Sequence, residues 1–266
     1  MDYHFTRGNF TESELEKAII ELFKQQGYTY LHGDEIHRPF KDVLLYDDLK
    51  AFLLSQYPDL TQSELSKIIS RLDNLPAVPL YEGNRDTYRL ISEGFDFVRE
   101  DPSKIGLHIN FIDFDNIDNN SFKVINQFIV EDGQTRIPDM LIFINGIPVS
   151  IFEFKSAIEE GKTIHNAWEQ ITIRYARDIP SLLKYTALSV ICDGANTRLG
   201  TIFTPYEFYY AWNKANEQDT VANGISSLFT MVEGAFAKDR VLSILRDFIF
   251  YPDDSEKQEA IICRYP

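Results

Sequence analysis

The chain has 266 residues, 44% of them hydrophobic, and a formal net charge of −15. This hydrophobic content is enough for the core of one large domain, whereas the negative charge repels phosphate over a Debye length of about 8–10 Å. The composition therefore excludes a protein whose whole surface binds nucleic acid, and any contact with a polyanion has to be local.

The first twenty residues are mixed and polar, without the apolar segment of a secretory signal. No run in the sequence reaches the roughly 18 apolar residues that span a bilayer. We therefore expect a protein that is neither exported nor inserted in a membrane, and thus a cytoplasmic one. The two cysteines, Cys192 and Cys263, lack the spacing of a disulfide framework or a metal site. We interpret them as free thiols in a reducing cytoplasm.

The first predicted helix begins at a capping box, Thr11-Glu12-Ser13-Glu14, in which Thr11 is the N-cap and Glu14 reaches back to its backbone. Apolar residues follow at helical spacing, and the helix is expected to end near Gly27. Glu16 lies at the border of the apolar stripe. It is either an ordinary solvated acid or a side chain that faces a site beside the core.

Helices and strands alternate along the next hundred residues. Residues 28–31 predict a short strand, and residues 47–56 predict a helix. A second capping box, Thr61-Gln62-Ser63-Glu64, starts another helix, and the prolines at 76 and 79 interrupt the pattern. The remaining predictions are a helix from about Arg85 to Gly94 and β-rich segments at 95–98, 107–114 and 121–131.

The strongest local signal is a hairpin at Asn145-Gly146, a dipeptide flanked on both sides by apolar, β-branched and aromatic runs. Asp139 opens the first strand, and Glu153 and Lys155 close the second. Strands this apolar are expected to be covered on both faces, where a charge is costly unless it is paired or binds a metal. Three ionisable groups at the ends of one buried hairpin therefore need an explanation.

The rest of the chain continues the alternation of strands and helices. A helix is predicted over 163–176, closed by Asp178-Ile179-Pro180. A strand at 187–192, a turn at 193–196 and a returning strand at 201–203 follow, and residues from about Glu207 onward are predicted to be mostly helical. The expected architecture is α/β with a mixed central sheet flanked by helices.

The turn geometry decides whether the hairpin acids can meet. Glu153 and Lys155 leave the same face of their strand because they are two residues apart. A plain two-residue loop at Asn145-Gly146 would pair residue 139 with 152 and send Asp139 to the opposite face. A three-residue loop, or one β-bulge, restores the common face and makes the two acids diagonal neighbours. We therefore predict that the turn is not a plain two-residue loop.

Two close carboxylates repel each other, and without compensation one of them takes up a proton. A hard divalent cation removes the conflict, and Mg²⁺ binds through one or two carboxylates and bridges to phosphate. A lysine beside such a metal can orient the attacking water and offset charge on phosphate. This arrangement suits metal-assisted phosphodiester hydrolysis. The other interpretation is a buried Glu153–Lys155 ion pair with a solvated Asp139 at the strand end.

Asp139, thirteen further residues and then Glu153-Phe154-Lys155 form a pattern that resembles the PD-(D/E)xK nuclease motif, with a literal Pro138-Asp139. The surrounding sequence looks like the amino-terminal part of the restriction (R, or HsdR) subunit of type I restriction-modification enzymes. The resemblance covers nearly the whole chain and is most specific from about 136 to 212. It is carried by Pro138-Asp139-Met140-Leu141-Ile142-Phe143-Ile144-Asn145-Gly146-Ile147-Pro148, Ala167-Trp168-Glu169-Gln170-Ile171, Arg174-Tyr175, Asp178-Ile179-Pro180 and the segments 189–200 and 206–212.

The resemblance implies roles for particular side chains. In that family the acids hold Mg²⁺ and the lysine assists the water, which here would be Asp139, Glu153 and Lys155. A Gln-x-x-x-Tyr motif on the next helix orients the site and touches DNA. Gln170 matches it, whereas Tyr175 stands five residues on instead of four, which on an ideal helix moves the two side chains apart around the axis.

A glutamate in the first helix often completes such sites, and Glu16 is the position carried over, with Glu12 as the fallback. The expected DNA contacts are Gln170, Arg174, Tyr175 and Arg177. Together with Lys155 and Lys162, these two arginines are the local basic groups that would meet phosphate. With so few basic groups, the chain alone is expected to bind duplex DNA weakly and without sequence preference.

The resemblance also implies an organisation and partners. Residues 1–206 would form the endonuclease domain, and residues 207–266 a mostly helical connector toward an ATP-driven translocase, before which this sequence ends at Arg264-Tyr265-Pro266. ATP would act only in the full-length subunit. The implied partners are double-stranded DNA and the type I methyltransferase (M) and specificity (S) subunits, without a membrane.

Two other functions stay open at this point. The chain could be a non-catalytic assembly module that keeps the nuclease fold for docking. It could also bind a nucleotide through Ser156-Ala157-Ile158-Glu159-Glu160-Gly161-Lys162-Thr163, which ends in Gly-Lys-Thr as a P-loop does. However, serine replaces the first glycine of that motif, and two glutamates stand where phosphates would bind, so the segment argues against a nucleotide site.

Overall fold

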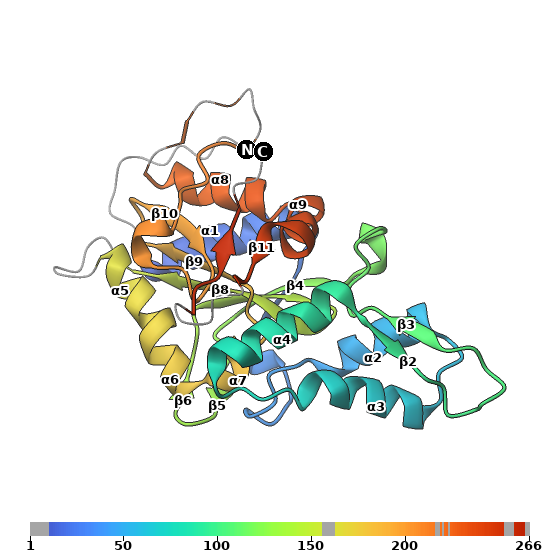
Figure 1. Cartoon of the computed structure of the whole chain (residues 1–266). Coiled ribbons are helices and arrows are strands. Elements are labelled where there is room, and N and C mark those ends of the chain that lie inside the picture. Colours follow the sequence, from blue (N-terminus) through green and yellow to red (C-terminus); the bar gives the residue numbers. More distant parts are fainter. Residues whose placement is uncertain are drawn as a thin grey trace.

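Six strands form a central sheet in a computed structural model of the chain, which describes residues 11–155, 163–215, 219, 221–222, 224–252 and 258–263 (Figure 1). The β1–β4 and β8–β9 pairs are parallel and the other pairs antiparallel, so the predicted α/β class with a mixed sheet is confirmed. In spatial order the strands are β1 (Thr29–His32), β4 (Phe122–Asn126), β7 (Met140–Ile144), β8 (Ile147–Phe154), β9 (Leu188–Cys192) and β10 (Thr197–Gly200).

Helices cover both faces of this sheet. In Figure 1, α1 (Glu12–Gln25) and α8 (Ser226–Ala235) lie on one face, and α4 (Leu80–Glu93) and α7 (Pro180–Leu183) lie on the other. Every residue of β7 and β8 is buried, which explains why their sequences are apolar at successive positions instead of alternating. Glu153 and Lys155, at the end of β8, are buried as well, and Asp139, just before β7, is half-buried.

The two capping boxes read from the sequence are both formed. In α1 the Glu14 N–H donates to Thr11 Oγ1 at 3.3 Å, and the Thr11 N–H donates to the Glu14 carboxylate at 2.9 Å. Thr61 and Glu64 make the same pair of bonds at the start of α3 (Gln62–Asp73). The helix predicted over 47–56 is α2 (Tyr46–Gln56), and the strand predicted at 28–31 is β1.

Some predicted bounds were wrong. The helix predicted from Arg85 begins five residues earlier, because the turn before it already packs inward: Tyr81 is buried, and buried Asn84 donates to carbonyls of the α7–β9 connection. The strand predicted at 201–203 is instead a turn. Thr201 and Thr204 hydrogen-bond the backbone of 201–203 with their hydroxyls, which competes with strand pairing.

The β-rich region before the hairpin is divided in a way that the sequence did not show. β2 (Phe95–Phe97) and β3 (Leu107–Ile109) pair with each other outside the central sheet. The segment predicted at 121–131 splits into β4 and β5 (Val130–Glu131), because Gln127 adopts a left-handed backbone with φ of 53°. β5 pairs with β6 (Thr135–Arg136), and these two short strands lead into the central hairpin.

The carboxyl-terminal segment, predicted to be mostly helical, contains α8, α9 (Lys238–Ser243) and the π-helical turn η5 (Ile244–Phe248), but also the strands β11 (Ile249–Phe250) and β12 (Ile261–Ile262). It packs on the same core as the first helix. Phe236 lies 5.9 Å from Phe23 of α1 and 5.0 Å from Phe152 of β8, ring centre to ring centre. In addition, the Tyr28 hydroxyl donates to the Phe236 carbonyl at 2.8 Å.

The remaining helical segments are short. They are α5 (Ile164–Glu169), the π-helical turn η3 (Gln170–Tyr175), α6 (Ala176–Asp178) and the 3₁₀ turns η1 (Gly33–Glu35), η2 (Ile117–Asn119) and η4 (Tyr206–Phe208). Within the described residues, no helix combines the length and the apolar character that crossing a bilayer requires.

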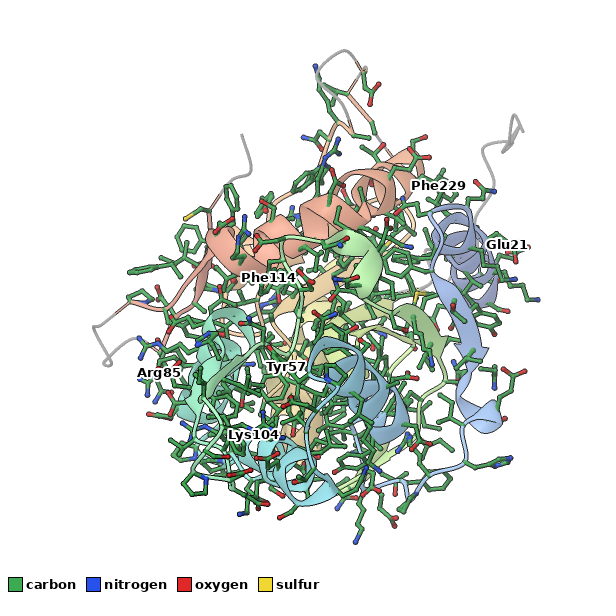
Figure 2. All side chains as sticks on the ribbon, turned by 90° about the vertical axis from the view of Figure 1, so that its right-hand side faces the viewer. Glu21, Tyr57, Arg85, Lys104, Phe114 and Phe229 are labelled. Atoms are coloured by element: carbon green, nitrogen blue, oxygen red, sulfur yellow. The ribbon has the colours of Figure 1, made fainter. Side chains whose placement is uncertain are left out.

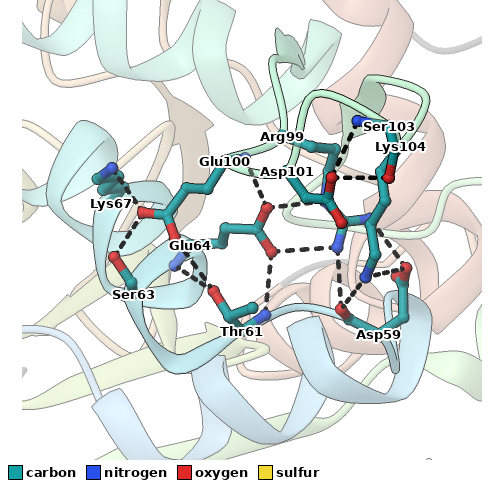
Figure 3. Close-up of polar contacts among 10 residues, drawn as sticks. All are labelled: Asp59, Thr61, Ser63, Glu64, Lys67, Arg99, Glu100, Asp101, Ser103 and Lys104. Atoms are coloured by element: carbon teal, nitrogen blue, oxygen red, sulfur yellow. Dashed lines mark hydrogen bonds and ion pairs between the residues drawn. The ribbon is translucent and has the colours of Figure 1, made fainter.

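The β2–β3 ribbon is held to α2 and α3 by polar contacts. The hydroxyl of Tyr57, labelled in Figure 2, donates to the His108 carbonyl at 2.9 Å and accepts the Asn110 N–H at 2.8 Å. Figure 3 shows a second attachment, in which Arg99 forms a two-pronged ion pair with Glu64 at 2.9 and 3.1 Å. Both side chains are buried, and Glu64 also accepts the Glu100 N–H.

These contacts predict how stability depends on pH. The Arg99 guanidinium and two backbone N–H groups lower the pKa of Glu64 to about 2 from an ordinary value of 4.5. Because the pKa is lower in the folded state, the pair stabilises the fold above pH 4.5, and this contribution is lost as the pH falls toward 2. Glu64→Gln should therefore lower the free energy of unfolding at pH 7, by an amount that shrinks toward pH 2.

The measurement is urea unfolding of wild type and variant from pH 2 to 7. Glu14→Gln is the matched control, because Glu14 holds the same capping position in α1 but is exposed and has no arginine partner among the described residues. A Glu64→Gln effect that stays constant over the pH range, or that is no larger than the control, would contradict the prediction.

Candidate active site

The hairpin turn is a two-residue loop followed by a β-bulge. Asn145 and Gly146 both have positive φ, 51° and 82°, as a type I′ turn requires, and Ile144 pairs with Ile147. The register then shifts between Ile142 and Phe143. One residue of β8, Val149, has no partner on β7, and its carbonyl instead accepts the N–H of Ala187.

This bulge restores the common face. Beyond it, Met140 pairs with Phe152, so the register brings Asp139 level with Glu153. The β-bulge alternative predicted from the sequence is confirmed, with one correction: the two acids stand directly opposite each other instead of diagonally. Glu153, with Lys155 two residues on, points away from the face on which Phe152 packs against α1.

Asp139 is half-buried at the end of this face. Its carboxylate Oδ2 accepts the backbone N–H of Phe154 at 2.7 Å. Asp139 is therefore not the solvated strand-end acid of the second interpretation. The other half of that interpretation, a buried ion pair, is present: Lys155 Nζ lies 2.7 Å from Glu153 Oε1 and 3.0 Å from the Phe154 carbonyl oxygen.

Two side chains from the following helix reach Glu153. The Gln170 amide donates to Glu153 Oε1 and, at 2.8 Å, to the Tyr175 hydroxyl. That hydroxyl donates in turn to Glu153 Oε2 at 3.3 Å. With Lys155, three donors therefore fix the orientation of the Glu153 carboxylate.

The five-residue spacing of Gln170 and Tyr175 is explained by the helix itself. Residues 170–175 form the π-helical turn η3, in which the Ala176 N–H bonds the carbonyl of Ile171, five residues back. A π-turn accommodates one extra residue in an α-helix. Five residues across it therefore bring two side chains to the same side, as four do in an ordinary α-helix.

The pKa values of the two hairpin acids, Asp139 and Glu153, are both raised. The pKa of Asp139 is raised to about 6 from 3.8, mainly by burial; the Phe154 N–H and Lys155 act against this rise, and the negative charges of Glu16 and Glu12 add to it. Burial also raises the pKa of Glu153, with the Asp139 charge as the second cause. The site thus holds more carboxylates than its one described cation, Lys155, can balance.

Glu16 reaches the site from the other face of the sheet. Its carboxylate accepts from the Asn126 side chain at 3.2 Å, and Asn126 stands level with Met140, on the face that α1 covers. Burial raises the pKa of Glu16. Among the described contacts, its influence on Asp139 is electrostatic, and so is that of Glu12.

Two residues beside the site were not predicted from the sequence. Asn126 ends the apolar strand β4 and holds Glu16, and the Tyr30 hydroxyl donates to Asn126 Oδ1 at 3.0 Å. The only sequence signal was a polar residue closing an apolar strand. Such a residue has many explanations until the neighbouring strand and helix are known.

The basic residues predicted to meet DNA are only partly described. Arg174 and Arg177 are exposed on η3 and α6, next to Tyr175. Lys162 and residues 156–162 of the P-loop-like segment lie outside the described residues.

Mg²⁺ prefers oxygen ligands, and the carboxylates of Asp139 and Glu153 are of this kind. In the part of the chain that the structure describes, no three His, Cys, Asp or Glu side chains converge as metal ligands. However, Mg²⁺ commonly binds through one or two carboxylates and keeps several waters. Asp139 and Glu153, with their raised pKa values, form such a pair, because a divalent cation would relieve the cost of ionising both.

Comparisons with known proteins identify relatives along most of the chain. The family described as "Type I restriction enzyme R protein N terminus" matches residues 9–208. A Methanocaldococcus jannaschii protein with the provisional name type I restriction enzyme MjaIXP endonuclease subunit is 28% identical over 94% of this chain and 26% of its own length. The type I restriction enzyme HindI endonuclease subunit of Haemophilus influenzae is 23% identical over 92% of this chain and 24% of its own length. The chain spans about a quarter of the length of these relatives.

The π-turn yields a testable prediction. Deleting Ile173, which is 56% exposed, should remove the inserted residue and leave an ordinary helix with Gln and Tyr four residues apart. The flanking segments keep their packing, so the melting temperature should stay within about 4 °C of the wild-type value.

The control is deletion of Lys17, an exposed residue of the regular helix α1. There the residues that follow rotate by about 100°, which takes Ile19 and Phe23 out of the core, and the protein should unfold. If deletion of Ile173 is as destructive as deletion of Lys17, η3 is not a one-residue insertion that the fold can lose.

Proposed function

The chain belongs to the family of type I restriction enzyme R protein N termini, and on this premise we propose that it is a Mg²⁺-dependent DNA endonuclease domain with a PD-(D/E)xK core. The observation that carries the proposal is the arrangement around Glu153. The bulge at Val149 and the π-turn at 170–175 place two acids, a lysine, a glutamine and a tyrosine together at one end of the sheet.

Each side chain has a role in this proposal. Asp139 and Glu153 would hold Mg²⁺, which when bound supplies a Lewis acid and lowers the pKa of a bound water. Lys155, 2.7 Å from Glu153 Oε1, would orient the attacking water toward the phosphate. Gln170 and Tyr175 keep the Glu153 carboxylate in one orientation, which preorganises the site before DNA enters.

The remaining residues act at the edges of the site. Arg174 and Arg177, together with Gln170 and Tyr175, would contact the DNA backbone. Glu16, held by Asn126, would add negative charge near Asp139 and so favour a cation there.

The proposal extends to the organisation of the larger protein. Residues 1–206 would be the endonuclease domain, and 207–266 a connector to an ATP-driven translocase. That connector is anchored to the nuclease core through Phe236. In a cytoplasmic complex, the M and S subunits would provide recognition of double-stranded DNA, because the described elements include no basic helix or ribbon for reading base edges.

A non-catalytic docking module is the second candidate. The observation in its favour is the Glu153–Lys155 ion pair, which satisfies both groups without a metal. The raised pKa values of Asp139 and Glu153 weigh against it, because a purely structural site gains nothing from a second buried acid.

Metal binding has a readout that does not need catalysis. Mg²⁺ or Ca²⁺ at ten times its dissociation constant should stabilise the folded chain by about 1.4 kcal/mol, visible as a higher melting temperature. Asp139→Asn should abolish this shift. Without metal at pH 8, the same variant should be at least as stable as wild type. The pKa of Asp139 is raised in the fold, so the cost of ionising it develops between pH 3.8 and about 6 and is fully present at pH 8.

Glu21→Gln, an exposed acid on α1 that pairs with Lys24 (Figure 2), is the control and should keep the full metal shift. An unchanged metal shift in Asp139→Asn would place the cation elsewhere, and the absence of any shift in wild type would favour the docking module.

Cleavage itself is tested in the intact restriction enzyme. Asp139→Ala, Glu153→Ala and Lys155→Ala should each abolish DNA cleavage and leave ATP hydrolysis and translocation largely unchanged, because those belong to another part of the subunit. Gln170→Ala should be milder, about 10–100-fold, because Gln170 acts by holding Glu153. Normal cleavage by the Glu153 variant would refute the proposed site.

A further inference from the structure

Next to the acidic site, two arginines from different elements share one buried carboxylate. Arg136 of β6 donates Nε to Asp178 Oδ2 at 2.8 Å and places Nη2 at 2.6 Å from the same oxygen. Arg177 donates Nε to Asp178 Oδ1 at 2.7 Å and Nη2 to Oδ2 at 3.2 Å. Asp178 is only 2% exposed.

The arginines themselves are not buried with their partner. The side chain of Arg177 is 72% exposed and that of Arg136 is 31% exposed. A guanidinium has five N–H donors, and Asp178 engages two from each arginine. The group therefore has one unit of positive charge in excess and presents further donors to solvent in a fixed geometry.

The short chain connections to Asp139 and Tyr175, together with two contacts between these segments, place the arginine–aspartate group near the acids of the hairpin. Arg136 precedes Asp139 by three residues, about 10 Å of extended backbone. Asp178 follows Tyr175 by three residues, so it lies on the same side of the helical segment. The Tyr175 hydroxyl lies 3.5 Å from the Ile137 carbonyl oxygen, and Gln134 donates its N–H to the Asp178 carbonyl, so the two elements are joined here. In Figure 1, β5 and β6 lie beside α6.

One acid on the neighbouring turn hydrogen-bonds a backbone N–H, and the described contacts include none between it and either arginine. Asp132, on the turn between β5 and β6, accepts the Ser181 N–H at the start of α7. Arg174, one helical turn from Arg177, adds a further exposed cation on the same segment. The edge of the site that carries Arg136 and Arg177 is thus positively charged, next to the acids Asp139 and Glu153.

We propose that Arg136, Asp178 and Arg177 form an anchor for one phosphate of the DNA backbone, adjacent to the phosphate that is cleaved. Paired arginines bind phosphate through several N–H donors at once, and the buried carboxylate holds both guanidinium groups in place before DNA arrives. The anchor rests on the proposed function, since it assumes that DNA is the substrate. Its role is to set which phosphate reaches the acids.

The test is duplex DNA binding by the 266-residue chain, measured by fluorescence anisotropy without divalent metal between about 50 and 200 mM salt. Each phosphate contact contributes about 0.9 to the slope of log affinity against log salt. Arg136→Gln and Arg177→Gln should each reduce the slope by about 1. Each variant leaves one arginine on Asp178, so the buried acid keeps a partner and the chain should fold.

Two further variants separate an anchor from a structural ion pair. Asp178→Asn keeps both arginines and removes the negative charge, so the DNA affinity of the folded variant should not fall. Arg246→Gln is the matched control. Arg246, in η5, also pairs with two acids, Asp115 and Asp247, and lies near Phe114, which is labelled in Figure 2; its loss should leave the slope unchanged.

Wild-type slopes in both Arg136→Gln and Arg177→Gln would overturn the anchor, as would an equal loss in Arg246→Gln or no measurable DNA binding by wild type. These outcomes are distinct from failure of the nuclease proposal. That proposal fails when the Glu153 variant of the intact enzyme still cleaves, whatever the salt slopes of the arginine variants.

Discussion

The site depends on one extra residue in a buried strand. Side chains of a β-strand alternate between faces, so a plain two-residue hairpin would leave Asp139 and Glu153 on opposite sides of the sheet. The bulge at Val149 shifts the register by one and brings them together. Because both faces are covered, a single-residue slip would bury an acid among aromatic side chains such as Phe23 and Phe236, which makes the register strongly determined.

An inserted residue also redirects side chains in the helical segment that follows the hairpin. One inserted residue in η3 lets Gln170 and Tyr175 share a side across five positions, and both then reach Glu153. Bulges in strands and π-turns in helices are found preferentially near functional sites, where they re-aim side chains. Here two independent insertions converge on one carboxylate, which is difficult to explain by packing alone.

The molecule contains two buried ionic groups whose carboxyl pKa values are shifted in opposite directions. Glu64 meets the planar fork of Arg99 and a backbone N–H, and its pKa falls, so that pair ties the β2–β3 ribbon to α3. At the hairpin, burial raises the pKa values of Asp139 and Glu153, and the charge of Lys155 does not offset this rise. In the Glu64–Arg99 pair the two charges balance each other. At the hairpin, an additional cation would favour the ionised forms of Asp139 and Glu153.

The sequence by itself determined the elements whose signals are local: the capping boxes at Thr11 and Thr61, the Asn145-Gly146 turn and the apolar strands around it. It also indicated Asp139, Glu153 and Lys155 as one group, because buried charge needs a reason. Only the tertiary structure decided between the two turn geometries, placed Glu16 and Asn126 on the other face, and joined Arg136 to Asp178. The physical reason is that these outcomes depend on register and on contacts between segments 40 to 110 residues apart, which no local pattern of residues encodes.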